Sequence, residues 1–406
     1  MSLHRAHLIV EGVVQGVGFR PFVYRLAREL NLSGWVMNTS GSVEIEVEGS
    51  PTGVAEFTRR LRDDAPPLSW IRDLRTRSQP PEGTASFEIH ESAAREGAFQ
   101  PISPDIATCE DCRRELFDPA NRRHGYPFTN CTNCGPRYTI IRDVPYDRPL
   151  TTMAPFPLCP RCREEYEDPM DRRFHAQPNA CPVCGPRLQF HDREGRARDG
   201  DPLDGAADLL QKGGILALKG LGGFHLACDA TRPEAVALLR TRKGRGGKPF
   251  AVMLPDVETL RRHCRPSAVE LETLRSPQAP IVLVPWEREA SDICDDVGPG
   301  LLFLGVMLPY TPLHHLLMAR LSRPLVMTSG NLSEEPIAKD NDEAVDRLRR
   351  LADGFLLHDR EILARCDDSV YFVEGDTPRP IRRARGHAPH PVVLDGDGPQ
   401  ILAVGA

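Results

Sequence analysis

Hydrophobic and polar positions over residues 1–91 follow the pattern of a small α/β domain. His4–Val13 alternates as a strand does, and apolar residues spaced three and four apart from Phe22 to Leu30 predict a helix. The pattern then predicts two strands, a second helix and two more strands, at Ser33–Asn38, Val43–Glu48, Thr52–Leu61, Leu68–Thr76 and Ser86–His90. This order is βαββαβ with one further strand at the end, close to that of the ferredoxin-like fold.

A second, longer α/β pattern covers residues 200–387. A helix at Ala206–Lys212 leads into the apolar run Gly213–Leu218, which predicts a buried strand. Alternating strands and helices of this kind are typical of an α/β domain. The region between the two domains, residues 92–190, begins with the polar linker Ser92–Gln100. We therefore expect a multidomain α/β protein with a different kind of structure in its middle.

The middle region contains a repeated cysteine pattern. Each copy consists of two Cys-x2-Cys pairs separated by eighteen residues, and the second copy follows at an offset of fifty residues. The cysteines are Cys109, Cys112, Cys131 and Cys134 in the first copy (109–134) and Cys159, Cys162, Cys181 and Cys184 in the second (159–184). Four thiolates suit the tetrahedral coordination of Zn2+, and a site without an open position is structural. The sequence predicts two structural zinc sites.

Other arrangements of the same cysteines are open at this point. Crossed pairing, in which the inner pairs share one site and the outer pairs the other, uses the same ligands, and four disulfides are the alternative to metal. The paired arginines Arg122–Arg123 and Arg172–Arg173 are predicted to be solvated, with contact to a phosphate or a partner as the alternative. His175 is not expected to bind the metal, because four thiolates complete the site.

The composition narrows the class of protein. The 406 residues carry a formal net charge of −6, which argues against a general nucleic-acid binder. Since the chain contains no run of eighteen apolar residues, no membrane span is predicted. The first seven residues lack the apolar core of a signal peptide. We expect a cytoplasmic protein, in which thiolates bind metal and seldom form disulfides.

Two glycines and an arginine separate the first predicted strand from the first predicted helix. The backbone N–H groups of this glycine-bearing loop, the helix N-terminus and the guanidinium of Arg20 are predicted to form an anion site. A tight turn with a surface arginine is the alternative.

The same segment resembles a known family. The motif Val14–Arg20, followed by Gly34–Asn38, is similar to the acylphosphatases. The resemblance implies that Arg20 holds the phosphate of an acyl phosphate and that Asn38 positions the attacking water. Such a substrate is already activated, so positioning and charge stabilisation suffice for its hydrolysis.

Loops of the longer α/β domain indicate a second anion site. A glycine-rich stretch, Lys219–His225, follows a predicted strand, and five cations lie within the nine residues of Arg240–Lys248. Cations this close repel one another unless they face solvent or a polyanion, so a solvated helix end and a phosphate site are both open. Ser329 and Asn331 in a later loop add a hydroxyl and an amide.

These loops resemble the YrdC-like family, which makes carbamoyl-type adenylates from ATP. The resemblance covers residues 200–386 and includes Lys243–Pro249 and Arg382–Gly386. It implies that ATP with Mg2+ is held by Lys219, His225, Arg242, Lys243, Arg245, Lys248, Ser329, Asn331 and Arg385. Threonylcarbamoyl-AMP synthases carry Thr and Tyr hydroxyls where this chain has Lys219–His225, so the departure favours an acyl group smaller than threonylcarbamoyl.

The order of the three parts resembles the HypF family of hydrogenase-maturation carbamoyltransferases. The resemblance implies hydrolysis of carbamoyl phosphate to carbamate at the first site, and its condensation with ATP to carbamoyl adenylate and pyrophosphate in the third domain. It also implies later transfer to a C-terminal cysteine of a partner protein, on the way to the cyanide ligands of the [NiFe] site. Residues 388–406 resemble the start of the transferase domain, so we expect a fragment that forms the adenylate without transferring it.

Two other functions fit parts of the sequence. One is a threonylcarbamoyl-AMP synthase for tRNA modification, and the other is a zinc-dependent interaction or RNA-binding module. The cysteine repeat offers neither an open coordination position nor an acid or base, so we expect it to be a spacer that holds the two chemical sites near each other.

Overall fold

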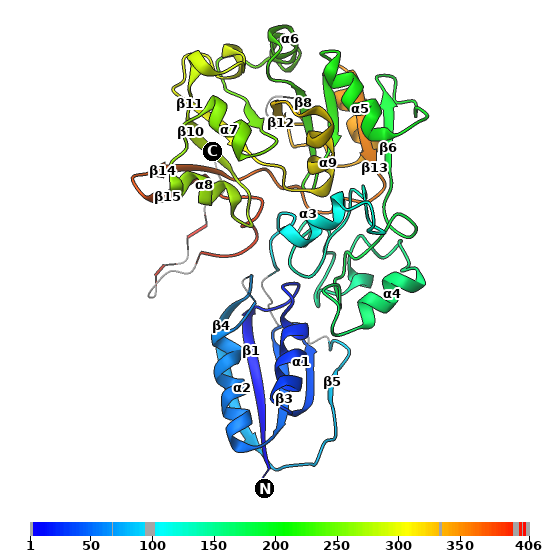
Figure 1. The fold of residues 1–406 in the computed structure, drawn as a ribbon, viewed down its shortest axis with the longest axis vertical. Helices are drawn as coiled ribbons and strands as arrows, with labels where there is room; N and C mark the ends of the chain where they lie inside the picture. The colour runs from blue at the N-terminus through cyan, green and yellow to red at the C-terminus, as the bar shows by residue number, and fades with distance from the viewer. Residues whose placement is uncertain are drawn as a thin grey trace.

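The computed structural model describes residues 3–66, 68–93, 102–332, 335–392, 398–399 and 401–402. Most of the predicted linker and of the expected transferase start lies outside these residues. Figure 1 shows three parts along the long axis of the molecule: the first domain, the cysteine-rich region with α3 and α4, and the longer α/β domain. None of the helices in these ranges is long and apolar enough to cross a membrane.

The first domain is a five-stranded sheet covered by two helices. Its strands are β1 (His4–Val13), β2 (Ser33–Asn38), β3 (Val43–Gly49), β4 (Trp70–Gln79) and β5 (Phe87–Ile89), and its helices are α1 (Phe19–Glu29) and α2 (Pro51–Asp63). The sheet order is β4-β1-β3-β2-β5, with β5 parallel to β2 at the edge. Leu8, Ile45 and Phe57 are fully buried between sheet and helices. The predicted ferredoxin-like fold is confirmed.

The cysteine-rich region consists of two similar halves with little regular structure. Helix α3 (Glu110–Phe117) and helix α4 (Pro160–Glu167) each begin directly after the first cysteine of their copy, and a 3-10 turn, η1 (Arg148–Leu150), lies between the copies. Its two buried hydrophobic clusters are small compared with those of the two α/β domains. Zinc bound by the predicted cysteine ligands would supply much of the folding free energy of this region, about 10–16 kcal/mol for each structural site.

The longer domain is built on a ten-stranded mixed sheet of order β15-β14-β10-β11-β9-β12-β8-β7-β13-β6. In chain order its strands are β6 (Leu188–Asp192), β7 (Leu216–Lys219), β8 (Phe224–Asp229), β9 (Ala251–Met253), β10 (Ile281–Pro285), β11 (Phe303–Met307), β12 (Leu325–Ser329), β13 (Gly354–His358), β14 (Val370–Glu374) and β15 (Thr377–Arg382). Because β6 pairs with β13, this sheet already begins at the end of the cysteine-rich region.

Helices cover both faces of the large sheet. They are α5 (Pro202–Gln211), α6 (Pro233–Lys243), α7 (Val257–His263), α8 (Ala268–Arg275), α9 (Pro312–Leu321) and α10 (Asn341–Leu348), with 3-10 turns η2 (Arg288–Ala290) and η3 (Asp295–Val297). One core includes apolar residues of α5 and α9, and the other includes those of α6, α7 and α10. Helix α5 starts four residues before the predicted position because Asp201 caps it, accepting from the backbone N–H of Leu203 at 2.7 Å.

The cysteine-rich region touches both α/β domains. On one side the Arg137 Nε donates to the Gly16 carbonyl at 2.6 Å. On the other side the Thr108 N–H donates to the Tyr310 carbonyl at 3.0 Å, and the Leu363 N–H donates to the Thr139 carbonyl at 2.8 Å. These contacts agree with the spacer role expected from the sequence.

Candidate active sites and metal centres

The first anion site is created by a left-handed turn before α1. Gly16 and Gly18 have φ values of 70° and 77°, a conformation that favours glycine, and Gly18 is the N-cap of the helix. The turn exposes backbone N–H groups and the positive end of the helix dipole at one point. Arg20 is the second residue of α1, so its side chain starts beside these donors.

Arg20 and Asn38, the two residues predicted to act at this site, lie next to each other. Asn38 ends β2, and with its side-chain amide turned so that the oxygen faces Arg20, that oxygen accepts from Nε and Nη2 of Arg20, both at 3.1 Å. Arg20 also donates through Nη2 to Asp147 of the cysteine-rich region at 3.3 Å. Both side chains are buried, Asn38 almost completely. The guanidinium is therefore oriented from two sides before any anion binds.

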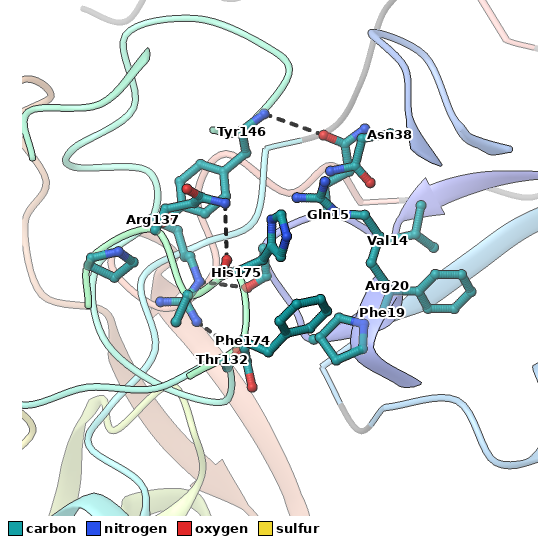
Figure 2. Close-up of a pocket in the computed structure, with 16 residues that line it drawn as sticks. Val14, Gln15, Phe19, Arg20, Asn38, Thr132, Arg137, Tyr146, Phe174 and His175 are labelled. Atoms are coloured by element: carbon teal, nitrogen blue, oxygen red, sulfur yellow. Dashed lines mark hydrogen bonds between the residues drawn. The ribbon is translucent and has the colours of Figure 1, made fainter. Parts of the chain in front are cut away.

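The cysteine-rich region forms the opposite wall of this site. Figure 2 shows the pocket between the Val14–Arg20 loop and residues of that region, which include Arg137, Tyr146, Phe174 and His175. The acylphosphatase-like site of this chain is thus enclosed between two domains.

The eight cysteines form two groups, each made of one contiguous copy. In both groups all four Sγ atoms lie within 4.8 Å of one another. In the first, Cys109 and Cys131 are 3.6 Å apart and Cys131 and Cys134 are 3.9 Å apart. A tetrahedron with metal–sulfur bonds of about 2.3 Å has sulfur atoms separated by about 3.8 Å, so the groups fit Zn2+. Contiguous pairing is observed instead of crossed pairing.

The sulfur positions also exclude disulfides within the two groups. Cys159 and Cys181 are 3.8 Å apart, and Cys181 and Cys184 are 3.7 Å apart, far beyond the bond length of about 2.05 Å. All eight cysteines are free thiols. When bound, zinc would hold the two knuckles of each copy together and would leave no coordination position for a substrate.

The prediction that the paired arginines are solvated is wrong. Arg123 and Arg173 are buried, and each pair crosses to the other copy of the repeat. Arg122 and Arg123 both bind Glu165, with closest distances of 2.6 and 2.5 Å. Arg172 and Arg173 bind Glu115 in the same way. These arginines can be buried because each of them forms an ion pair with a carboxylate, which offsets the cost of removing its charge from water.

A cavity of about 560 Å³ lies at the face of the longer domain. Five of the residues predicted to hold ATP line it: His225, Arg245, Lys248, Ser329 and Asn331. Lys243 stands behind them, and its Nζ donates to the Ser329 carbonyl at 2.6 Å and to Asn331 Oδ1 at 2.9 Å. The predicted loop that follows β12 is described up to Leu332 only.

The cations at this cavity are held close together at an electrostatic cost. Burial and the neighbouring Arg245 and Lys248 lower the pKa of Lys243 to about 8. Burial and Arg240 lower the pKa of Arg245 to about 10. A polyanion in the cavity would relieve this repulsion, which is the property expected of a phosphate site.

Besides Lys243, three further predicted ATP ligands do not line the cavity. Lys219 donates to Asn341 Oδ1 at 2.8 Å and to the His358 carbonyl at 3.0 Å, in a smaller pocket against the cysteine-rich region. Arg242 pairs with Asp353 at 2.8 Å. Arg385 is buried below the cavity floor and bonds to Asp368 at 2.7 Å. Arg242 belongs to the basic cluster in the sequence but lies outside the site, because its position on helix α6 directs it toward Asp353.

A buried hydrogen-bonded chain of Arg385, Asp368 and His225 lies at the wall of the cavity. Asp368 accepts from Arg385 and lies 3.0 Å from His225 Nε2. Although burial opposes ionisation, Arg385 and His225 hold the pKa of Asp368 well below its ordinary value. His225 is thereby oriented toward the cavity by a carboxylate that remains charged.

Family models match all three parts of the chain. The acylphosphatase model matches residues 6–89, the HypF finger model matches residues 108–141 and 158–191, and the Sua5/YciO/YrdC model, described as telomere recombination, matches residues 208–384. The chain is 51% identical over 422 residues to the carbamoyltransferase HypF2 of Cupriavidus necator, which covers 99% of this chain. This chain belongs to the HypF family.

Solved structures agree with this assignment. The full-length HypF in its phosphate- and nucleotide-bound form has a TM-score of 0.93 and 48% identity to this chain, covering 97% of this chain and 52% of its own. The HypF of T. kodakarensis has a TM-score of 0.87 and covers 95% of this chain and 50% of its own. The chain spans about half the length of the curated HypF relatives it matches, 52% in the case of Cupriavidus necator.

The acylphosphatase assignment of the first domain stands independently of HypF. The acylphosphatase of Moorella thermoacetica is 46% identical over 93 residues, which are 99% of that protein.

Several residues of the first HypF site were missed by sequence reasoning. Asp147, His175 and Gln177 all reach the Arg20 pocket from the cysteine-rich region. For Asp147 the local sequence carries no signal, since its role depends on contact with a residue 127 positions away. For His175 the sequence does carry a signal, because at the offset of fifty residues it stands where the first repeat has Gly125.

Proposed function

We propose that this HypF chain hydrolyses carbamoyl phosphate and condenses the resulting carbamate with ATP to give carbamoyl adenylate. The observation that carries the proposal is the presence, in one chain, of a buried Arg20–Asn38 anion site and a cavity lined by Arg245 and Lys248, with the buried Lys243 behind them. The cysteine-rich region contacts the domains of both sites.

In the first step, phosphate is the part of the substrate that the loop and Arg20 recognise. Backbone N–H groups at the start of α1 and the guanidinium stabilise the charge that develops on the phosphate. Asn38 holds Arg20 in place and offers an amide to orient water. Water adds to the acyl phosphate, and carbamate and inorganic phosphate leave, so no acid or base of the protein is needed beyond these groups.

In the second step, a carbamate oxygen attacks the α-phosphorus of ATP. The bond between the α-phosphorus and the bridging oxygen breaks, and pyrophosphate leaves with its charge compensated by Arg245, Lys248 and Mg2+. Ser329 and Asn331 line the same wall and supply further polar contacts. Carbamate is short-lived in water, so a protected route past the cysteine-rich region would favour the second step.

The later fate of the carbamoyl group is also a proposal. We infer that it passes to a C-terminal cysteine of a hydrogenase-maturation partner and contributes to the cyanide ligands of the [NiFe] site. Free thiolates for zinc are maintained in a reducing compartment, which supports a cytoplasmic location. The alternative, a threonylcarbamoyl-AMP synthase, is not favoured, because the relatives that match nearly the whole chain are carbamoyltransferases.

A pyrophosphate assay tests the proposal. We expect pyrophosphate release from Mg-ATP only when carbamoyl phosphate is present. Arg20→Ala should abolish that release while ATP binding remains, and freshly dissolved ammonium carbamate should restore it. Arg28→Ala, an exposed arginine on the same helix, is the matched control and should behave as wild type. Release without carbamoyl phosphate, or full release by Arg20→Ala, would contradict the proposal.

A further inference from the structure

We propose that His175 is a specificity residue of the first site, accepting a hydrogen bond from the amino group of carbamoyl phosphate and so selecting it over other acyl phosphates. The inference rests on the proposed hydrolysis at Arg20. It concerns a side chain from the cysteine-rich region that forms part of the pocket wall opposite the anion loop (Figure 2).

The backbone of His175 adopts a conformation that the first repeat assigns to glycine. At the offset of fifty residues His175 corresponds to Gly125, and the two have φ values of 49° and 68°. The hydrogen bond is also repeated: the Gly125 N–H donates to the Leu116 carbonyl at 2.9 Å, and the His175 N–H to the Tyr166 carbonyl at 3.0 Å. Glycine adopts this turn without strain, whereas histidine does not. A strained residue in a pocket wall points to a role for its side chain.

The ring of His175 packs against two aromatic side chains, and one of its two nitrogens has no polar partner among the described residues. Phe174 lies against it with ring centroids 4.5 Å apart, and Tyr166 at 4.9 Å. Nδ1 is buried and has no hydrogen-bond partner among the described residues. Burial and the nearby Arg20 lower the pKa of His175 to about 4, so the imidazole is neutral at neutral pH. A neutral ring nitrogen can accept a hydrogen bond, which a protonated one cannot.

Neighbouring polar groups on this wall are already engaged. Gln177 Oε1 accepts from the Arg148 N–H at 2.7 Å and from the Tyr166 hydroxyl at 2.8 Å. Arg137 Nε donates to the Gly16 carbonyl. Because the loop and Arg20 offer donors to the phosphate, the acyl end of the substrate faces this wall. An amino group there would satisfy His175, whereas the methyl group of acetyl phosphate would not.

Hydrolysis of two acyl phosphates by the zinc-loaded chain tests the inference. The values of kcat/KM for carbamoyl phosphate and acetyl phosphate are measured by phosphate release for wild type, His175→Gly and His175→Asn. Glycine suits the positive φ, and asparagine tolerates it while keeping an acceptor. His124→Gly, an exposed histidine of the first repeat, is the control. Zinc content of two per chain verifies that each variant is folded.

We expect His175→Gly to lower kcat/KM for carbamoyl phosphate about tenfold while acetyl phosphate changes by less than about twofold. His175→Asn should recover part of the loss. An equal fall for both substrates, or no fall for either, would overturn the role of His175. Wild type that hydrolyses neither substrate, or Arg20→Ala that hydrolyses both normally, would instead refute the proposed function of the site.

Discussion

Arg122 Nη2 lies 3.2 Å from Sγ of Cys162, so a guanidinium of the first zinc repeat donates to a ligand thiol of the second. The contact is reciprocal, because Arg172 Nη1 lies 3.2 Å from Sγ of Cys112. Each cysteine group therefore receives a hydrogen bond from an arginine of the other copy. A donor from outside the coordination sphere stabilises thiolate charge and orients the ligand. The two repeats form one structural unit, a property that their separate spacing does not reveal.

Replacement of Arg122 should weaken zinc binding at the second quartet, although Arg122 belongs to the first. For Arg122→Gln we expect an affinity loss of about 10- to 100-fold at that site, the usual effect of removing a partner of a ligand. Competition with a chelator, followed as zinc release, measures it. Arg113→Gln removes an exposed arginine that pairs with Glu110 within α3, and it is the control. Identical release from both variants would show that the cross-repeat contact has no energetic role.

Replacement of Asn38 should impair hydrolysis more than substrate binding. Asn38 supports Arg20 through two hydrogen bonds of 3.1 Å and is almost fully buried. For Asn38→Ala we expect kcat for carbamoyl phosphate to fall about 100- to 1,000-fold, as when one stabilising group is removed from an active site. Steady-state phosphate release gives kcat and KM separately. A change confined to KM would argue that Asn38 only binds the substrate.

Two arginines three residues apart should differ in their effect on ATP binding. Arg245 lines the large cavity, whereas Arg242 pairs with Asp353 outside it. Loss of a charged hydrogen bond of about 1.5–3 kcal/mol predicts that Arg245→Ala raises the Kd for ATP about 10- to 100-fold. Arg242→Ala should leave the Kd within about threefold, since it lies outside the site. Calorimetric titration of both variants with ATP measures the two Kd values. A larger increase in Kd for Arg242→Ala than for Arg245→Ala would place the nucleotide site elsewhere.

The neutral state of His175 should make stability depend on pH. In the unfolded chain a histidine has a pKa of about 6.5, whereas burial and Arg20 lower the pKa of His175 to about 4 in the folded protein. As pH falls through this window the unfolded chain binds a proton that the folded one does not, so stability is lost. We expect a loss of about 2 kcal/mol between about pH 7 and about pH 5 that His175→Asn does not show.

Denaturant unfolding of the zinc-loaded wild type and variant measures this difference. Zinc loss at low pH affects both proteins alike and cancels in the comparison. Parallel pH dependence of the two would mean that His175 is solvated in the folded state.

Local chemistry explains why much of this protein was predictable from its sequence. The knuckle Cys131–Cys134 is complete within four residues, and the same holds for the glycine turn that places Arg20 at the start of α1. The strand and helix order of the first domain follows from the alternation of apolar residues, which depends on neighbours in the chain. The sequence therefore indicated the elements that carry Arg20 and Asn38 and the cysteines that come together, whereas the roles of Arg20 and Asn38 stay predictions.

Tertiary packing decided the rest, because it depends on contacts between distant segments. Asp147 and His175 reach Arg20 across more than a hundred residues, and the paired arginines are buried because the second repeat folds against the first. In the same way, α6 directs Lys243 toward Ser329 and Asn331 behind the cavity wall, whereas the next residue before it, Arg242, pairs with Asp353. Residue type alone indicates which chemistry is possible, but the direction of each side chain depends on which surface its element buries.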